Sequence, residues 1–211
     1  MNAAAPTIHV VDDDDLFRTA LARALRRSGY HVQLYESADR LMEAQPTAGP
    51  GCIVLDVMMP GVSGPELQSY LAKRDNVLPI IFLTGYGDLP TGVRAIKAGA
   101  EDFLTKPVAK KILIEAIQRA LARYEQTRER LERLASMRSI VDTFTPRQRE
   151  VFDLVVRGKM NKQIAHELRT AERTIKAHRH AVMGKLKIRS VAEAVSIAEQ
   201  LGILAHKGNN D

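Results

Sequence analysis

The chain has 211 residues, of which 45% are hydrophobic and 27% charged, a composition typical of a globular protein with one or two domains. No apolar run approaches the roughly 18–20 residues of a membrane helix, and the N-terminus lacks the charged-then-apolar pattern of a secretory signal. We therefore expect a cytoplasmic protein without membrane partners. A single cysteine, Cys52, excludes a disulfide within the chain, and its place in an apolar run predicts a small core residue.

The net charge of +6 is unevenly distributed along the chain. Residues 1–120 contain 13 Lys and Arg against 14 Asp and Glu, a balance of −1, whereas residues 121–211 contain 18 against 11, a balance of +7. This asymmetry suggests that only the second half binds a polyanion. A solvated basic surface is the alternative that charge alone leaves open.

Short apolar runs alternate with segments of helical periodicity in the first 122 residues. Gly29, after the first helical segment, is the residue type that commonly ends a helix. The alternation predicts an α/β domain whose five-stranded parallel sheet carries helices on both faces. Expected strands are residues 8–11, 32–34, 52–55, 79–84 and 102–105, and expected helices are residues 17–25, 38–42, 65–73, 91–98 and the segment from 109 onward.

The remainder of the chain is predicted to be helical. Residues 123–142 are rich in Arg, Glu and Leu and lack Gly and Pro, which favours a helical linker, with a coiled-coil role left open. Thr145-Pro146 has the residue types of a cap and a first turn, and the helix that it opens would end at Gly158. Further helices are expected at 161–168, after Arg169-Thr170-Ala171 and at 190–201, an order that indicates a helix-turn-helix.

Polar residues follow several of the predicted strands. Loops after parallel strands meet at one sheet edge, so we expect Asp12, Asp13, Asp56, Thr84 and Lys106 to converge. Clustered carboxylates repel one another unless a cation lies among them, and an all-oxygen set suits Mg²⁺. Asp56 could then attack a phosphoryl group, with Thr84 bonded to a phosphoryl oxygen and Lys106 balancing charge.

A purely structural role is the alternative for these acids. An Asp run before a helix commonly caps that helix, which would explain Asp14 and Asp15, and a lone strand-end Asp is usually structural.

Four motifs in this order resemble the receiver domain of bacterial two-component response regulators. The resemblance spans about residues 6–122 and implies a doubly wound, CheY-like fold. It implies that Asp56 accepts phosphate from a histidine kinase, that Asp12, Asp13, Asp56 and the Met58 carbonyl hold Mg²⁺, and that Lys106-Pro107 is a cis peptide. Thr84 and Phe103 would form the switch pair. The motifs are Val11-Asp12-Asp13, Leu55-Asp56-Val57-Met58-Met59-Pro60-Gly61, Leu83-Thr84-Gly85 and Phe103-Leu104-Thr105-Lys106-Pro107.

Three positions in this pattern vary among such domains. Met58 and Tyr86 could shield a phosphoryl group from water or simply pack. Phe103 has no hydroxyl, so its switching would depend on packing alone.

The predicted helix after Ala171 has an apolar side and a basic side. Its apolar residues Ile175, Val182 and Leu186 would face inward, leaving an outward face suited to the DNA major groove. A solvated surface is again the alternative. The outward face comprises Arg173, Lys176, Ala177 and His180, and the candidate phosphate contacts are Asn161, Lys162, Thr174 and Lys185.

Residues 143–205 resemble the LuxR-type output domain of the NarL/FixJ group. The resemblance is carried by Thr145-Pro146-Arg147-Gln148-Arg149-Glu150-Val151, Gly158-Lys159-Met160-Asn161-Lys162-Gln163-Ile164-Ala165 and Arg173-Thr174-Ile175-Lys176-Ala177-His178-Arg179. Thr84-Gly85-Tyr86-Gly87-Asp88 followed by Pro90 is FixJ-like. Ala171 departs from the usual serine before the recognition helix, so we expect Thr170 to cap that helix instead.

Together these patterns predict a phosphorylation-controlled transcription regulator rather than an enzyme. Its domains would be a receiver (1–122), a helical linker (123–142) and an output domain (143–211). Its partners would be a sensor histidine kinase, double-stranded promoter DNA, RNA polymerase and a second copy of the chain. A metal-dependent phosphohydrolase using Asp56 and a phosphorylation-independent DNA-binding or adaptor protein with a vestigial pocket are the alternatives.

Overall fold

A computed structural model describes residues 5–46, 49–74, 76–85 and 89–204. The chain divides into two compact units, residues 1–128 and 129–211. The division falls inside one long helix, Lys110–Asp142.

The first unit is built on a five-stranded, wholly parallel sheet with strand order β2-β1-β3-β4-β5. The prediction of a parallel α/β fold is therefore confirmed. β3 and β4 are buried at every position, which explains their unbroken apolar sequences. The strands are β1 (Thr7–Val11), β2 (His31–Tyr35), β3 (Gly51–Leu55), β4 (Ile80–Thr84) and β5 (Asp102–Thr105).

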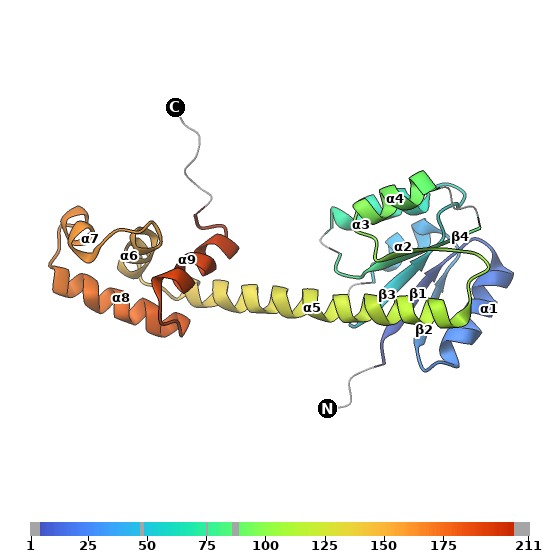
Figure 1. The fold of residues 1–211 in the computed structure, drawn as a ribbon, viewed down its shortest axis with the longest axis horizontal. Helices are drawn as coiled ribbons and strands as arrows, with labels where there is room; N and C mark the ends of the chain where they lie inside the picture. Colours follow the sequence, from blue (N-terminus) through green and yellow to red (C-terminus); the bar gives the residue numbers. More distant parts are fainter. Residues whose placement is uncertain (1–4, 47–48, 75, 86–88, 205–211) are drawn as a thin grey trace. The chain divides into compact units, whose positions relative to one another are not determined.

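Helices cover both faces of this sheet (Figure 1). One core cluster joins side chains of the sheet to α2, α3 and α4, and the other joins the opposite face to α1 and α5. Cys52 is fully buried in the second cluster, as predicted, and burial raises the pKa of its thiol to about 12. The helices are α1 (Asp15–Arg26), α2 (Ala38–Ala44), α3 (Gly64–Ala72), α4 (Leu89–Lys97) and α5 (Lys110–Asp142).

Helix ends in this unit follow from local chemistry. The Asp14 carboxylate accepts a hydrogen bond from the Phe17 amide at 3.0 Å and caps α1, so the capping role expected of Asp14 is confirmed. α3 begins one residue before the predicted Pro65, where the Glu66 carboxylate accepts hydrogen bonds from the Ser63 amide at 2.9 Å and from the Ser63 hydroxyl at 2.7 Å. α4 begins at Leu89, two residues before the predicted start.

α5 is a single helix of 33 residues that continues through the predicted linker. It contains no Gly or Pro that would end it earlier, as the sequence indicated. Within the described part of the chain, no helix combines the length and apolar character needed to cross a bilayer.

The second unit is all-helical and has two apolar clusters, one around Phe152 and one around Ile164. A capping box of Thr145 and Gln148 opens α6, with Pro146 in the first turn, which confirms that predicted start. α8 buries Ile175, Val182 and Leu186, so the predicted inward face is also confirmed. The helices are α6 (Pro146–Val156), α7 (Asn161–Glu167), α8 (Glu172–Leu186) and α9 (Val191–Gln200).

The start of α8 differs from the prediction. Its N-cap is Ala171, which has no side-chain oxygen and makes no capping hydrogen bond, so Thr170 does not cap the helix. The Thr170 amide instead bonds to the Ala165 carbonyl at 2.9 Å, which ties the turn to α7.

Candidate functional site

Three charged side chains meet at the carboxyl edge of the sheet. Asp12 follows β1, Asp56 follows β3 and Lys106 follows β5, so the parallel strands deliver all three to one place. The Lys106 ammonium donates to Asp12 Oδ2 at 2.6 Å and to Asp56 Oδ2 at 3.0 Å. The Lys106-Pro107 peptide is cis, as the family resemblance implied.

Burial and charge act together on these groups. The Asp12 and Asp56 side chains are only 3% and 10% exposed, and that of Lys106 is 17% exposed. Burial raises the pKa of Asp12 above its ordinary value, although hydrogen bonds from Lys106 and the Asp14 amide oppose the rise. Burial lowers the pKa of Lys106, but hydrogen bonds to the two carboxylates outweigh this and hold it above its ordinary value. The pocket therefore concentrates negative charge around one ammonium group.

A third carboxylate completes an oxygen-rich cluster. Asp13 is exposed, and its carboxylate lies with those of Asp12 and Asp56 so that one oxygen of each is within 4.8 Å of the others. Such a set of hard oxygen donors beside open solvent fits Mg²⁺, which retains several water ligands.

Arg18 on α1 supports the same acidic loop, and the sequence reasoning did not identify it. Its guanidinium donates to the Asp12 carbonyl at 2.6 Å and to the Asp15 carboxylate at 2.7 Å, and the residue is buried. The i,i+3 spacing from Asp15 was a visible signal for the ion pair. No sequence pattern indicated the bond to the Asp12 carbonyl.

Thr84 and Phe103 lie on neighbouring strands beside the pocket. Thr84 is the last residue of β4 and is fully buried, and its carbonyl accepts from the Lys106 amide at 2.7 Å. Phe103 on β5 is half-buried, with its ring centroid 6.1 Å from that of Phe82. A Cβ on Gly92 would lie 3.2 Å from the Phe103 ring, so α4 closes over this aromatic side chain.

Of the two residues expected to shield a phosphoryl group or to pack, only Met58 lies among the described residues. Met58 is 68% exposed, so it does not pack into the core. Tyr86 lies outside the described residues.

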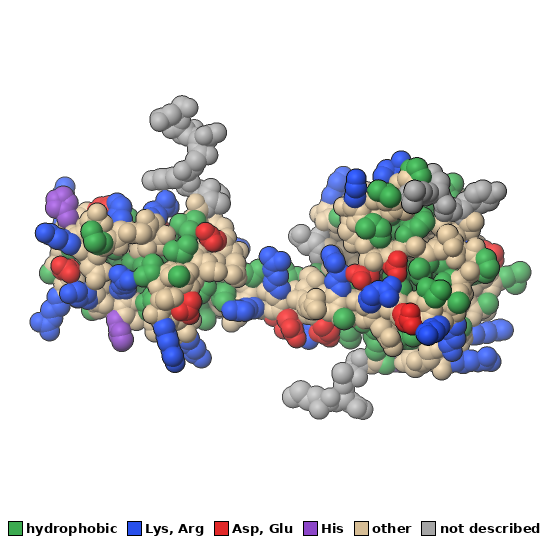
Figure 2. Space-filling model, viewed as in Figure 1, with side chains coloured by type: hydrophobic (Ala, Val, Ile, Leu, Met, Phe, Trp, Pro, Cys, Tyr) green, Lys and Arg blue, Asp and Glu red, His purple; other side chains and the backbone are tan. Residues whose placement is uncertain are grey.

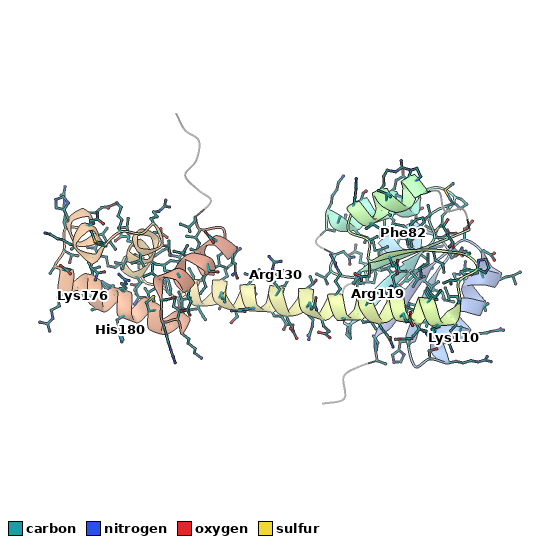
Figure 3. All side chains as sticks on the ribbon, in the orientation of Figure 1. Phe82, Lys110, Arg119, Arg130, Lys176 and His180 are labelled. Atoms are coloured by element: carbon teal, nitrogen blue, oxygen red, sulfur yellow. The ribbon has the colours of Figure 1, made fainter. Side chains whose placement is uncertain are left out.

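In the second unit, α8 presents a polar face to solvent. Arg173, Thr174, Lys176, Ala177 and His180 are exposed, as is Lys162 on α7. Lys176 and His180 lie one turn apart on this helix (Figure 3). Lys and Arg side chains gather around α7 and α8 in the face shown in Figure 2. A basic helix exposed in this way has the chemistry of a nucleic-acid interface.

Two of the predicted phosphate contacts already have partners within the unit. Asn161 accepts a hydrogen bond from Arg179 at 3.0 Å. The Lys185 ammonium donates to the Thr143 carbonyl and to Gln148 Oε1, both at 2.9 Å. Asn161 and Lys185 therefore differ from the other two predicted phosphate contacts, Lys162 and Thr174, which are exposed to solvent.

Two family models match the chain in the order of these two units. Residues 8–118 match the response regulator receiver domain, and residues 142–203 match bacterial regulatory proteins of the luxR family. The chain belongs to the response regulators with a LuxR-type output domain.

Relatives of this response regulator match it over nearly its whole length. Nodulation protein W of Bradyrhizobium diazoefficiens is 41% identical over 94% of this chain and 88% of its own. Transcriptional regulatory protein FixJ of Rhizobium meliloti is 37% identical over 91% of this chain and 94% of its own. The solved structure of response regulator StyR has a TM-score of 0.75 at 42% identity, covering 93% of this chain and 100% of its own.

The family assignment confirms a receiver domain and a LuxR-type DNA-binding domain in one two-component transcription regulator. The crystal structure of full-length FixJ from B. japonicum also matches, with a TM-score of 0.58 at 34% identity, covering 96% of this chain and 99% of its own.

Proposed function

We propose that the protein is switched by phosphorylation of Asp56 and that the switch controls sequence-specific DNA binding. The observation that carries this proposal is the pocket itself, where Asp56 lies beside Lys106 and within reach of two further carboxylates. The Asp56 carboxylate can act as a nucleophile in this position, and the adjacent Lys106 ammonium can balance the negative charge of phosphorylated Asp56.

A sensor histidine kinase would supply the phosphoryl group. An Asp56 carboxylate oxygen attacks the phosphorus of the phosphohistidine, the P–N bond breaks, and an acyl phosphate forms as the histidine regains its lone pair. Asp12, Asp13, Asp56 and the Met58 carbonyl would hold Mg²⁺, which when bound neutralises phosphoryl charge. Lys106 balances the remaining negative charge, and the Thr84 hydroxyl bonds to a phosphoryl oxygen.

The response to phosphorylation would pass through Thr84 and Phe103. As Thr84 turns toward the phosphoryl group, space opens beside β4, and the Phe103 ring repacks against α4. The surface made by α4, β5 and α5 then changes and favours a homodimer. The domain boundaries that we propose are 1–122 for the receiver, 123–142 for the linker and 143–211 for the output domain.

The output domain would place α8 in the major groove of double-stranded promoter DNA. Its base contacts would come from Arg173, Lys176, Ala177 and His180, with phosphate contacts from Asn161, Lys162 and Thr174. RNA polymerase would be the partner that responds to the protein bound on promoter DNA. The protein would act in the cytoplasm.

Treatment with acetyl phosphate and Mg²⁺ tests the proposal. We expect wild type to shift on a phosphate-affinity gel and to bind DNA fragments selected by the phosphorylated protein more tightly than before treatment. Asp56→Asn should fold normally and show neither change. Exposed Asp39→Asn on α2 is the matched control and should behave as wild type.

Other outcomes separate the alternatives. If the gel shift is absent in wild type while DNA binding persists, the protein is a phosphorylation-independent regulator. Turnover of a small phosphate ester beyond one equivalent per chain would instead indicate a phosphohydrolase.

A further inference from the structure

The segment between α5 and α6 concentrates negative charge and backbone acceptors. The last turn of α5 contains no basic residue and ends at Asp142, so a carboxylate adds to the negative end of the helix dipole. Cations from other helices compensate. Arg149 on α6 donates to the Val141 carbonyl at 3.0 Å and lies 3.5 Å from the Asp142 carboxylate.

Lys185, in the last turn of α8, is the second cation at this junction. Its ammonium donates to the Thr143 carbonyl and to Gln148 Oε1, and lies 5.6 Å from the centroid of the buried Phe144 ring. Gln148 Oε1 also accepts from the Thr145 amide at 3.1 Å, so the same oxygen closes the cap of α6. One ammonium thus links the end of α8 to both the linker end and the start of α6.

We propose that Lys185 is a positioning residue that fixes the recognition helix on the α5–α6 junction, rather than a contact to a DNA phosphate. The inference rests on the proposed role of α8 in reading DNA. Two of the three ammonium donors are committed to protein oxygens, and the aromatic ring lies beside the charge. Lys185 therefore fixes the position of α8 on the α5–α6 junction, and other residues neutralise the DNA phosphates.

Salt dependence distinguishes positioning from phosphate contact. Each neutralised phosphate contributes a slope of about −0.9 to the plot of log affinity against log salt. The experiment compares full-length Lys185→Gln with Lys162→Gln, which makes the same chemical change at an exposed lysine of α7. Binding to a fluorescein-labelled random-sequence duplex is measured by anisotropy across a KCl series, and melting is followed by circular dichroism.

We expect Lys185→Gln to leave the slope unchanged and to lower the melting temperature of the output domain by about 4–8 °C. Lys162→Gln should reduce the slope by about 0.9 without changing the melting temperature. Lys185→Arg, which retains charge and donors, should restore most of the lost stability. A reduced salt slope together with an unchanged melting temperature for Lys185→Gln would overturn the proposal.

A double-mutant cycle supplies an independent readout. Gln148→Ala and Lys185→Gln should together lower the melting temperature by less than the sum of their separate effects, because both remove the same contact. Additive losses would contradict the inference. An unchanged slope in Lys162→Gln alone would refute only the phosphate role of Lys162, whereas failure of acetyl-phosphate-treated wild type to select any DNA fragment would refute the proposed function.

Discussion

Replacement of Lys106 by methionine removes the ammonium group that contacts both Asp12 and Asp56. The substitution keeps an unbranched apolar stem of similar length but loses ammonium contacts of 2.6 and 3.0 Å. Both carboxylates then remain in a largely buried position without their shared counter-charge. We expect the receiver domain to become less stable in EDTA.

The structure gives the scale of this loss. With an effective dielectric constant of about 20, each ammonium–carboxylate attraction is roughly 6 kcal/mol, and carboxylate oxygens at the 4.8 Å limit of the cluster repel by about 3.5 kcal/mol. Desolvation offsets much of the attraction. Breaking a buried pair costs about 3–5 kcal/mol, and the 17% exposure of Lys106 admits screening water, so we expect about 2–3 kcal/mol.

Thermal melting by circular dichroism measures the effect, since the chain has no Trp for fluorescence. A loss of this size lowers the melting temperature by about 6–15 °C. Mg²⁺ should recover part of it, because a cation that binds the native pocket stabilises the folded state. The transition that responds to Mg²⁺ identifies the receiver domain.

Lys110→Met, at an exposed lysine four residues later, is the matched control and should melt as wild type. Two results would refute the electrostatic reasoning. One is an unchanged melting temperature of Lys106→Met in EDTA. The other is an equal loss with and without Mg²⁺, which would indicate a packing defect.

Three further perturbations test other parts of the receiver. Gly64→Ala would place a Cβ 2.4 Å from the Asp56 carbonyl, so we expect a loss of about 1–3 kcal/mol in urea unfolding and slower labelling by acetyl phosphate; wild-type values for both would contradict this. Cys52, whose thiol is buried, should react with a thiol reagent only as the domain unfolds, and rapid labelling of native protein would disprove that burial. Burial lowers the pKa of His9 below 6.5, so the unfolded chain binds more protons and stability falls as the pH drops below 6.5; His9→Gln should reduce this dependence, and an identical pH profile would exclude His9 as its source.

Periodicity and residue chemistry by themselves determine much of the fold of this protein. Unbroken apolar runs such as that of β3 specify strands buried on both faces, and their alternation with helices leaves few topologies other than a parallel sheet. That topology predicted the meeting of Asp12, Asp56 and Lys106, because parallel strands end at one edge. The inward face of α8 followed in the same way from helical spacing.

Tertiary structure alone decided which distant groups oppose each polar side chain. The sequence around a basic residue on a helix face does not reveal whether its side chain contacts water, a phosphate or a carbonyl. Nothing local therefore distinguished Lys185 from Lys162. Of these two lysines, only Lys185 is held by the α5–α6 junction. Arg18 likewise has its Asp12 carbonyl partner only because α1 packs beside the end of β1. Periodicity specifies the face of an element, but a hydrogen-bond partner depends on the element packed against that face.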